Sequence, residues 1–139
     1  LREKAAGLEG FVASMGNPHF VIPVKSTADA PVTTLGPKIE THPDFPSRVN
    51  VEFVEILSKT RVKQRTWERG SGETFACGSG ACAVGYALSS AGLTERRTRI
   101  DLLGGTLEIE VADDGRVFMT GPAVEVFRGD WPTNGARGR

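Results

Sequence analysis

The sequence predicts an α+β domain in which a mostly antiparallel sheet wraps around one central, buried helix. Two observations carry this prediction. Residues 79–91 are apolar nearly all round, which is typical of a helix without a solvent-facing side. The other apolar runs are short and separated by turn signals, as expected of antiparallel strands. A chain of 139 residues can bury a real core, so residues 1–139 are predicted to form a single domain.

The N-terminal third predicts a hairpin followed by a short helix. Residues 11–15 and 20–24 are apolar and flank a Gly-Asn-Pro-His break, the pattern of strand, turn and strand. Within residues 31–42, Leu35 and Ile39 lie four positions apart, on one helical face. A Gly-Pro pair between them weakens the helix prediction, because proline disrupts helix interiors.

Two strands are predicted in the middle of the chain. Residues 49–57 alternate apolar and polar side chains until Phe53, where the pattern slips by one position. Such a slip indicates either a bulge or burial of both faces. Residues 61–67 are more polar and are predicted to form an edge strand.

The remainder of the chain predicts a meander that follows the helix. Gly92 stands where a C-terminal glycine cap belongs. Gly104-Gly105 and Asp114-Gly115 are hairpin turn signals. Four strands are expected, at residues 98–102, 106–111, 116–120 and 123–127, and the two turns separate the first three.

Composition excludes several classes of protein. Lys plus Arg and Asp plus Glu number 17 each, which argues against a nucleic-acid or membrane-surface binder, since these need a basic excess. No apolar run approaches the ~18 residues of a membrane span. Two cysteines are too few for a disulfide scaffold, so we expect reduced thiols in a cytoplasmic protein. Because the chain begins with Leu1 and not with Met, it could be a fragment of something longer.

The stretch ERGSGETFACGSGACA, at residues 68–83, is the candidate site. Cys77 directly precedes the predicted helix, where free N–H groups and the helix dipole lower a thiol pKa. Gly78 and Gly80 leave backbone N–H groups free to face an anion such as a carboxylate, and Ser79 adds a hydroxyl. A helix cap with a small buried cysteine explains the same residues about as well.

Other polar residues are weaker candidates on local grounds. Cys82 lies part of a turn further round the helix and is expected to pack in the core, with no Cys or His at metal-ligand spacing. Glu68 and Arg69 end a strand and point to opposite faces, so one of them can serve the site mainly through its backbone. Asn50 is unusual at a strand centre. His19 is either an acid/base or positioning group, or an ordinary surface residue.

Three motifs together resemble the diaminopimelate epimerase family: MGNPHFV at residues 15–21, VNVEF at residues 49–53, and the stretch at residues 68–83. Their order and spacing are similar to the C-terminal half of that enzyme. The resemblance implies two similar domains that close over an amino-acid substrate, each supplying one cysteine. It also implies cofactor-independent epimerisation of LL-diaminopimelate to the meso form, for lysine and peptidoglycan synthesis. One thiolate removes the Cα proton, and the other thiol reprotonates the opposite face.

The resemblance also assigns roles to single residues. Cys77 matches one of the two catalytic cysteines, and His19 and Glu68 match positions that assist the cysteines. The substrate-binding positions are matched by Asn17, Asn50, Glu68, Arg69, Gly78 and Ser79. No metal and no cofactor is implied, and intact members form homodimers.

The chain lacks the N-terminal half of that family, with its cysteine. We therefore expect residues 1–139 to be the C-terminal domain of an epimerase, inactive alone. Three alternatives stay open: a related cofactor-independent amino-acid racemase, a non-catalytic domain that binds an amino acid or a partner protein, and a cysteine hydrolase using Cys77 and His19. The hydrolase would lack an evident third group to orient the histidine.

Overall fold

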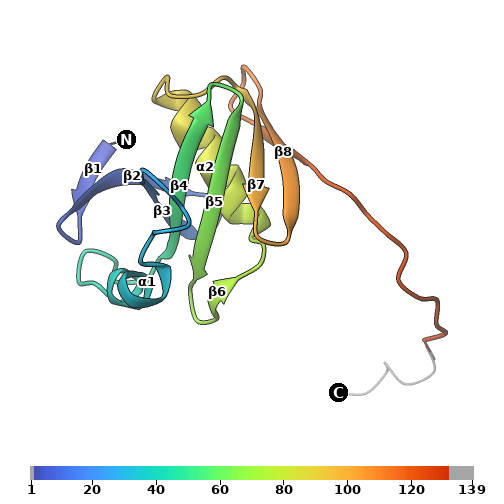
Figure 1. Cartoon of the computed structure of the whole chain (residues 1–139), viewed down its shortest axis with the longest axis horizontal. Coiled ribbons are helices and arrows are strands. Elements are labelled where there is room, and N and C mark those ends of the chain that lie inside the picture. Colours follow the sequence, from blue (N-terminus) through green and yellow to red (C-terminus); the bar gives the residue numbers. More distant parts are fainter. Residues whose placement is uncertain (1, 132–139) are drawn as a thin grey trace.

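The computed structural model describes residues 2–131 and shows a curved sheet wrapped around one helix (Figure 1). The expected α+β class is confirmed, with nine strands and two helices among the described residues. The sheet order is β1-β2-β3-β4-β5-β7-β8-β9, and β6 pairs only with β5. The elements are β1 (Arg2–Ala5), β2 (Leu8–Ser14), β3 (Pro18–Pro23), α1 (Val32–Glu40), β4 (Asn50–Ser58), β5 (Arg61–Glu68), β6 (Gly72–Thr74), α2 (Gly78–Ser90), β7 (Arg97–Leu102), β8 (Gly105–Val111) and β9 (Val117–Thr120).

The sheet is mixed, although most of its pairs are antiparallel as predicted. Six of the eight strand pairs between described residues are antiparallel, while β3–β4 and β5–β7 are parallel. Two parallel neighbours cannot be joined by a tight turn and need a longer crossover. The chain between β3 and β4 contains α1, and the chain between β5 and β7 contains α2. The two helices are therefore the crossovers of the two parallel pairs.

Strand β5 is an interior strand, so the predicted edge position is wrong. It pairs with β4 on one side and with β7 and β6 on the other. Val62, Gln64 and Thr66 alternate along its buried face. The two polar side chains, Gln64 and Thr66, hydrogen-bond to each other, and Gln64 lies beside Gly80 at the beginning of α2.

Residues 123–127 form no strand, so that prediction is also wrong. Residues 121–131 run away from the domain as an extended segment, visible at the right of Figure 1. Val124, Val126 and Phe127 are each more than four-fifths exposed. An apolar alternation makes a strand only where a neighbour completes its hydrogen bonds, and the described part of the chain offers none to this segment. At the other end, β1 was not predicted from the sequence, and it pairs with β2.

Strand β4 separates two apolar cores. Val54 packs with the α2 side chains Ala81, Val84 and Leu88 in one core, and Phe53 packs with α1 in the other. Burial of both faces explains the slip in the β4 alternation, since residues 50–54 are all buried. The irregularity in the β4–β5 pairing lies further on, after Ile56.

Both helices were predicted, and each contains a glycine with a packing reason. Helix α1 lies within the expected residues 31–42, and a Cβ on its Gly36 would stand 2.6 Å from the Trp67 ring. Helix α2 begins at Gly78, right after Cys77, as expected. Gly92, with a φ of +71°, follows its C-terminus as the predicted cap.

Candidate functional site

The candidate residues meet at the N-terminal end of α2. In the parallel pair β3–β4, His19 lies opposite Asn50, so the first residues of both strands reach the same edge of the sheet. The antiparallel pairing of Val51 with Trp67 brings the end of β5 to that same edge. The topology therefore gathers Asn17, His19, Asn50, Glu68 and the first turn of α2, which are remote in sequence.

Cys77 is the N-cap residue of α2. Its backbone is extended, and its Sγ accepts a hydrogen bond from the Gly80 N–H at 3.4 Å. The Ser79 hydroxyl lies 3.6 Å from the same sulfur. Oxygen-bearing side chains are the usual N-caps, so a cysteine here places a thiol where a helix presents unpaired N–H groups. The predicted position of Cys77 is confirmed, and its side chain is 7 % exposed.

The protonation preference of Cys77 differs from the expectation. Burial raises the pKa of the Cys77 thiol above its ordinary value, while hydrogen bonds from Ser79 and Gly80 lower it. The nearby carboxylates of Glu68 and Glu52 raise it further, because they disfavour a second negative charge. The helix end lowers the thiol pKa through these hydrogen bonds, as expected, but burial raises that pKa by more. In the chain by itself, the thiol is therefore favoured over the thiolate.

Asn17 contacts the first turn of α2 directly, and His19 contacts Asn17. The Asn17 amide nitrogen donates to Ser79 Oγ at 3.3 Å, and its oxygen lies 3.0 Å from His19 Nε2. His19 is fully buried, which excludes the surface-residue alternative. The structure thus joins Asn17, His19, Ser79 and Cys77 through a continuous series of side-chain contacts.

Asn50 connects two backbone segments of the site. Its amide nitrogen donates to the Pro18 carbonyl at 2.9 Å, and its oxygen accepts from the Arg69 backbone N–H at 2.9 Å. The Arg69 guanidinium is exposed and donates to the Ser47 carbonyl at 2.9 Å. Toward Asn50, Arg69 thus contributes its backbone and not its charge.

Glu68 faces the site, in contrast to its neighbour Arg69. Its Oε1 accepts from the Thr74 hydroxyl at 2.6 Å, across the β5–β6 pair. Its charge also contributes to the raised pKa values of Glu52 and Cys77, after burial in each case. The structure therefore brings all the predicted site residues to one region, while their roles stay predictions.

Three buried polar residues on the same face were not predicted from the sequence: Glu52, Gln64 and Thr66. Glu52 Oε1 lies 2.7 Å from His19 Nδ1, and Gln64 donates to Thr66 Oγ1 at 2.9 Å. A signal for Glu52 was available, because it follows Asn50 by two positions and so shares its face of β4.

Glu40, at the end of α1, holds the turn that carries Arg69. Its two carboxylate oxygens accept from the Gly70 backbone N–H at 2.9 Å and from the Trp67 indole N–H at 2.7 Å. The carboxyl group is almost completely buried, with Arg48 as its ion-pair partner at 3.4 Å. Helix α1 thus determines where the end of β5 lies.

Replacing Glu40 with alanine is expected to lower the free energy of unfolding by about 2–3 kcal/mol, since hydrogen bonds to a charged acceptor are lost. Urea denaturation of the chain followed by circular dichroism measures this. Lys38→Ala is the matched control, because Lys38 is exposed on the same helix. Equal midpoints for the two variants would show that Glu40 does not support the turn.

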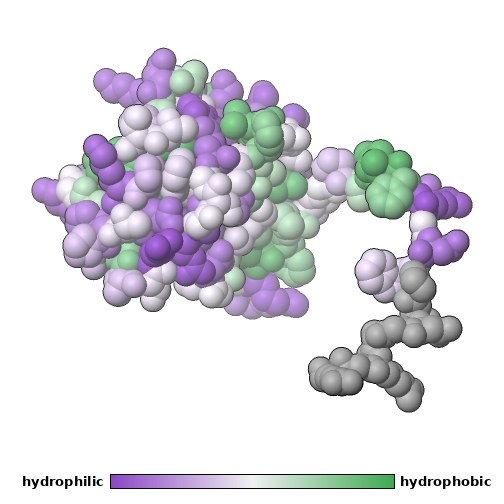
Figure 2. Space-filling model, turned by 90° about the horizontal axis from the view of Figure 1, so that it is seen from below, coloured by the Kyte–Doolittle hydropathy of each residue, from purple (hydrophilic) through white to green (hydrophobic). Residues whose placement is uncertain are grey.

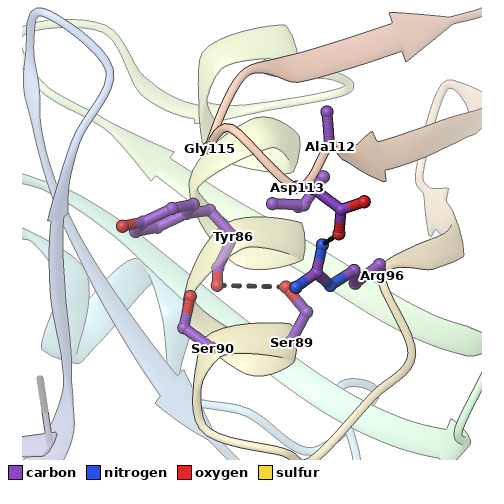
Figure 3. A pocket seen from close by; sticks show the side chains of 8 residues that line it. Tyr86, Ser89, Ser90, Arg96, Ala112, Asp113 and Gly115 are labelled. Atoms are coloured by element: carbon purple, nitrogen blue, oxygen red, sulfur yellow. Dashed lines mark hydrogen bonds and ion pairs between the residues drawn. The ribbon is translucent and has the colours of Figure 1, made fainter.

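A hollow at the opposite end of α2 contains none of the predicted residues (Figure 3). It has a volume of about 310 Å³ and is crossed by an exposed Arg96–Asp113 ion pair. Ser89 Oγ donates to the Tyr86 carbonyl within the helix. The side chains of Arg96, Asp113 and Ser89 in this hollow are therefore already engaged by neighbouring groups. Among residues 2–131, no group of three or more His, Cys, Asp or Glu side chains could hold a metal ion.

Solved structures share this fold. The structure of a predicted epimerase from Pseudomonas aeruginosa superposes with a TM-score of 0.56 at 22% identity, covering 90% of this chain and 48% of that chain. At that identity the match shows the fold alone. The chain therefore belongs to a structural class of α+β domains in which a curved sheet wraps around a central helix.

Sequence comparison then gives the particular family. The sequence model of diaminopimelate epimerase matches residues 11–126. A diaminopimelate epimerase of Leptospira biflexa is 62% identical over 84% of this chain and 42% of its own length. A diaminopimelate epimerase of Moorella thermoacetica is 52% identical over 88% of this chain and 44% of its own length. The chain belongs to the diaminopimelate epimerase family, which confirms the resemblance carried by the three motifs, and it spans less than half the length of these curated relatives.

None of the helices among residues 2–131 is long and apolar enough to span a membrane.

Proposed function

We propose that this chain is the C-terminal domain of a cofactor-independent epimerase that converts LL-diaminopimelate to the meso form. In this proposal Cys77 is one of two acid/base thiols, and the intact enzyme is a cytoplasmic homodimer of lysine biosynthesis. The observation that carries it is the position of Cys77 at the N-terminus of α2, in contact with Ser79 and Gly80, in a member of this family.

The site suits proton transfer at an amino-acid Cα, which is a very weak acid. Removing its proton needs a positioned base and stabilisation of the charge that develops on the carboxylate. The first N–H groups of a helix have no intrahelical partner, so those of Gly78 and Ser79 can bind that carboxylate. Asn17 and Asn50 add amide groups beside them.

The two forms of Cys77 serve the two directions of the reaction. The raised pKa caused by burial favours the thiol, which is the form that returns a proton to Cα. The thiolate, needed for proton removal, is stabilised by the Ser79 hydroxyl and the Gly80 N–H. His19 and Glu68 flank the site as the proposed assisting groups.

Inversion at Cα requires an acid and a base on opposite faces of the substrate. The other cysteine of the chain is Cys82, which packs against the α2 core. It therefore cannot stand opposite Cys77 across a small substrate. The second thiol is proposed to come from an N-terminal domain outside this sequence.

The test follows deuterium incorporation at Cα of LL-diaminopimelate in D2O. The chain alone is expected to give no exchange, whereas a chimera with the N-terminal domain of the Leptospira biflexa relative is expected to give exchange and inversion. Exchange by the chain alone that Cys77→Ala abolishes would contradict the half-site proposal. If the chimera inverts another amino acid but not diaminopimelate, the related racemase replaces the epimerase.

A further inference from the structure

Glu52 is a buried carboxyl group that has no role in the proposed function. The side chains of Glu52 and His19 are both 0 % exposed, and Oε1 of Glu52 lies 2.7 Å from Nδ1 of His19. Among the described residues, His19 is the only side chain that hydrogen-bonds to Glu52, and Oε2 has no partner. A buried carboxyl group with an unpaired oxygen costs stability, so packing does not explain it.

The partners of His19 fix where its hydrogens lie. The 2.7 Å contact between Nδ1 and Glu52 Oε1 needs one shared proton. Nε2 faces the Asn17 amide oxygen at 3.0 Å, and an amide oxygen can only accept. With the amide in this orientation, Nε2 carries a hydrogen, whichever atom of the His19–Glu52 pair holds the shared proton.

The same donor order continues to Cys77. Because the Asn17 oxygen faces His19, its NH2 group faces Ser79 and donates to Oγ at 3.3 Å. The Ser79 hydroxyl hydrogen is then free to point at Cys77 Sγ, 3.6 Å away. Every bond from His19 to Cys77 thus runs in one direction, toward the sulfur.

We infer that Glu52 is a positioning residue: it shares one proton with Nδ1 of His19, keeps a hydrogen on Nε2, and so fixes the Asn17 amide with its NH2 toward Ser79 and Cys77. This inference deepens the proposed function at the same site. The hydrogen on Nε2 can be tested without any epimerase activity.

The first turn of α2 is shaped around the His19–Glu52 pair. A Cβ on Gly80 would lie 2.8 Å from Glu52 Oε1 and 3.1 Å from Gln64 Nε2, so the helix backbone covers the carboxyl group closely. The other ionisable groups that face the pair are Glu68 and Cys77. Burial raises the pKa of Glu52 and His19 lowers it, with a smaller upward contribution from Glu68. These opposing influences suit a proton shared between carboxyl and imidazole.

The test is nitrogen-15 NMR of the histidine side chains in the 139-residue chain. His42→Gln removes the second histidine and assigns the signals to His19. Nε2 of the unaltered His19–Glu52 pair is expected to carry a hydrogen. Glu52→Gln is expected to keep it, because its amide can donate to Nδ1, whereas Glu52→Leu is expected to give a mixture of tautomers. The inference would be overturned if Nε2 carried no hydrogen in the unaltered pair. It would also be overturned if His19 in Glu52→Leu kept the same single tautomer as in the unaltered chain.

A kinetic arm covers the case in which Glu52→Leu does not fold in the chain. In the active chimera, Glu52→Leu is expected to lower kcat by about a hundredfold with a smaller change in KM, and Glu52→Gln to lose less. Equal losses for the two variants would contradict the positioning role. An inactive unaltered chimera would instead count against the proposed function, leaving the NMR result to decide on Glu52.

Discussion

Replacing Cys77 with alanine is expected to lower the rate of epimerisation by the two-domain enzyme at least about a thousandfold, because positioned acid/base groups contribute on that order. The measurement is deuterium incorporation at Cα, together with the ratio of stereoisomers at equilibrium. The loss is expected in kcat more than in KM, since the groups proposed to bind the carboxylate stay in place.

Two further variants separate chemistry from folding at this position. Cys77→Ser keeps an N-cap that helices prefer, so its stability is expected to stay close to that of the parent, but an alcohol is a far poorer acid/base group. Cys77→Ala loses the cap and about 0.5–2 kcal/mol of stability as well. Cys82→Ala, in the α2 core, is expected to keep activity. Comparable activity in the Cys77→Ser and parent enzymes would exclude Cys77 as the acid/base group.

Replacing Gly80 with alanine is expected to destabilise the chain by about 1–3 kcal/mol, as overpacking does in tight cores. In most helices a Gly-to-Ala substitution is stabilising instead, because Ala is favoured over Gly in a helix by about 1 kcal/mol. Here the added methyl group would lie 2.8 Å from Glu52 Oε1 and 3.2 Å from Cys77 Sγ. Glu52 cannot move without disturbing its hydrogen bond to His19, and Cys77 cannot move without disturbing its hydrogen bond from the Gly80 N–H.

Thermal and urea unfolding measure this effect, with Ser90→Ala as the control on the exposed end of the same helix. The control is expected to change stability by less than about 0.5 kcal/mol. In the chimera, Gly80→Ala is also expected to lower kcat by about a hundredfold, since misplaced catalytic groups have that effect. A Gly80→Ala chain as stable as its parent would show that the close contacts relax without cost.

The sequence was sufficient where local rules decide the structure. Helix α2 and the cap at Cys77 follow from an apolar run, a preceding polar turn and Gly92, all within one segment. The hairpin turns at Gly105 and Gly115 follow equally from local backbone requirements, as their positive φ angles show.

The predictions failed where the neighbours of a segment decide. Polar residues of β5 indicated solvent, but Gln64 and Thr66 face the site instead. Residues 123–127 have a strand pattern but no strand beside them. Glu52 was overlooked because a polar residue in an alternating strand usually marks the solvent face, and only the parallel pairing of β3 with β4 puts His19 against it.

The extended segment at residues 121–131 bears on how the chain behaves at high concentration. Figure 2 shows hydrophobic side chains gathered on this segment, outside the domain. An apolar, unpaired backbone is a template for strand addition by another chain, and a net charge of zero gives little repulsion to prevent it. Glu125, Arg128 and Asp130 interrupt the apolar run and so oppose such pairing. We therefore expect this segment, more than the well-packed core, to determine the colloidal stability of the chain.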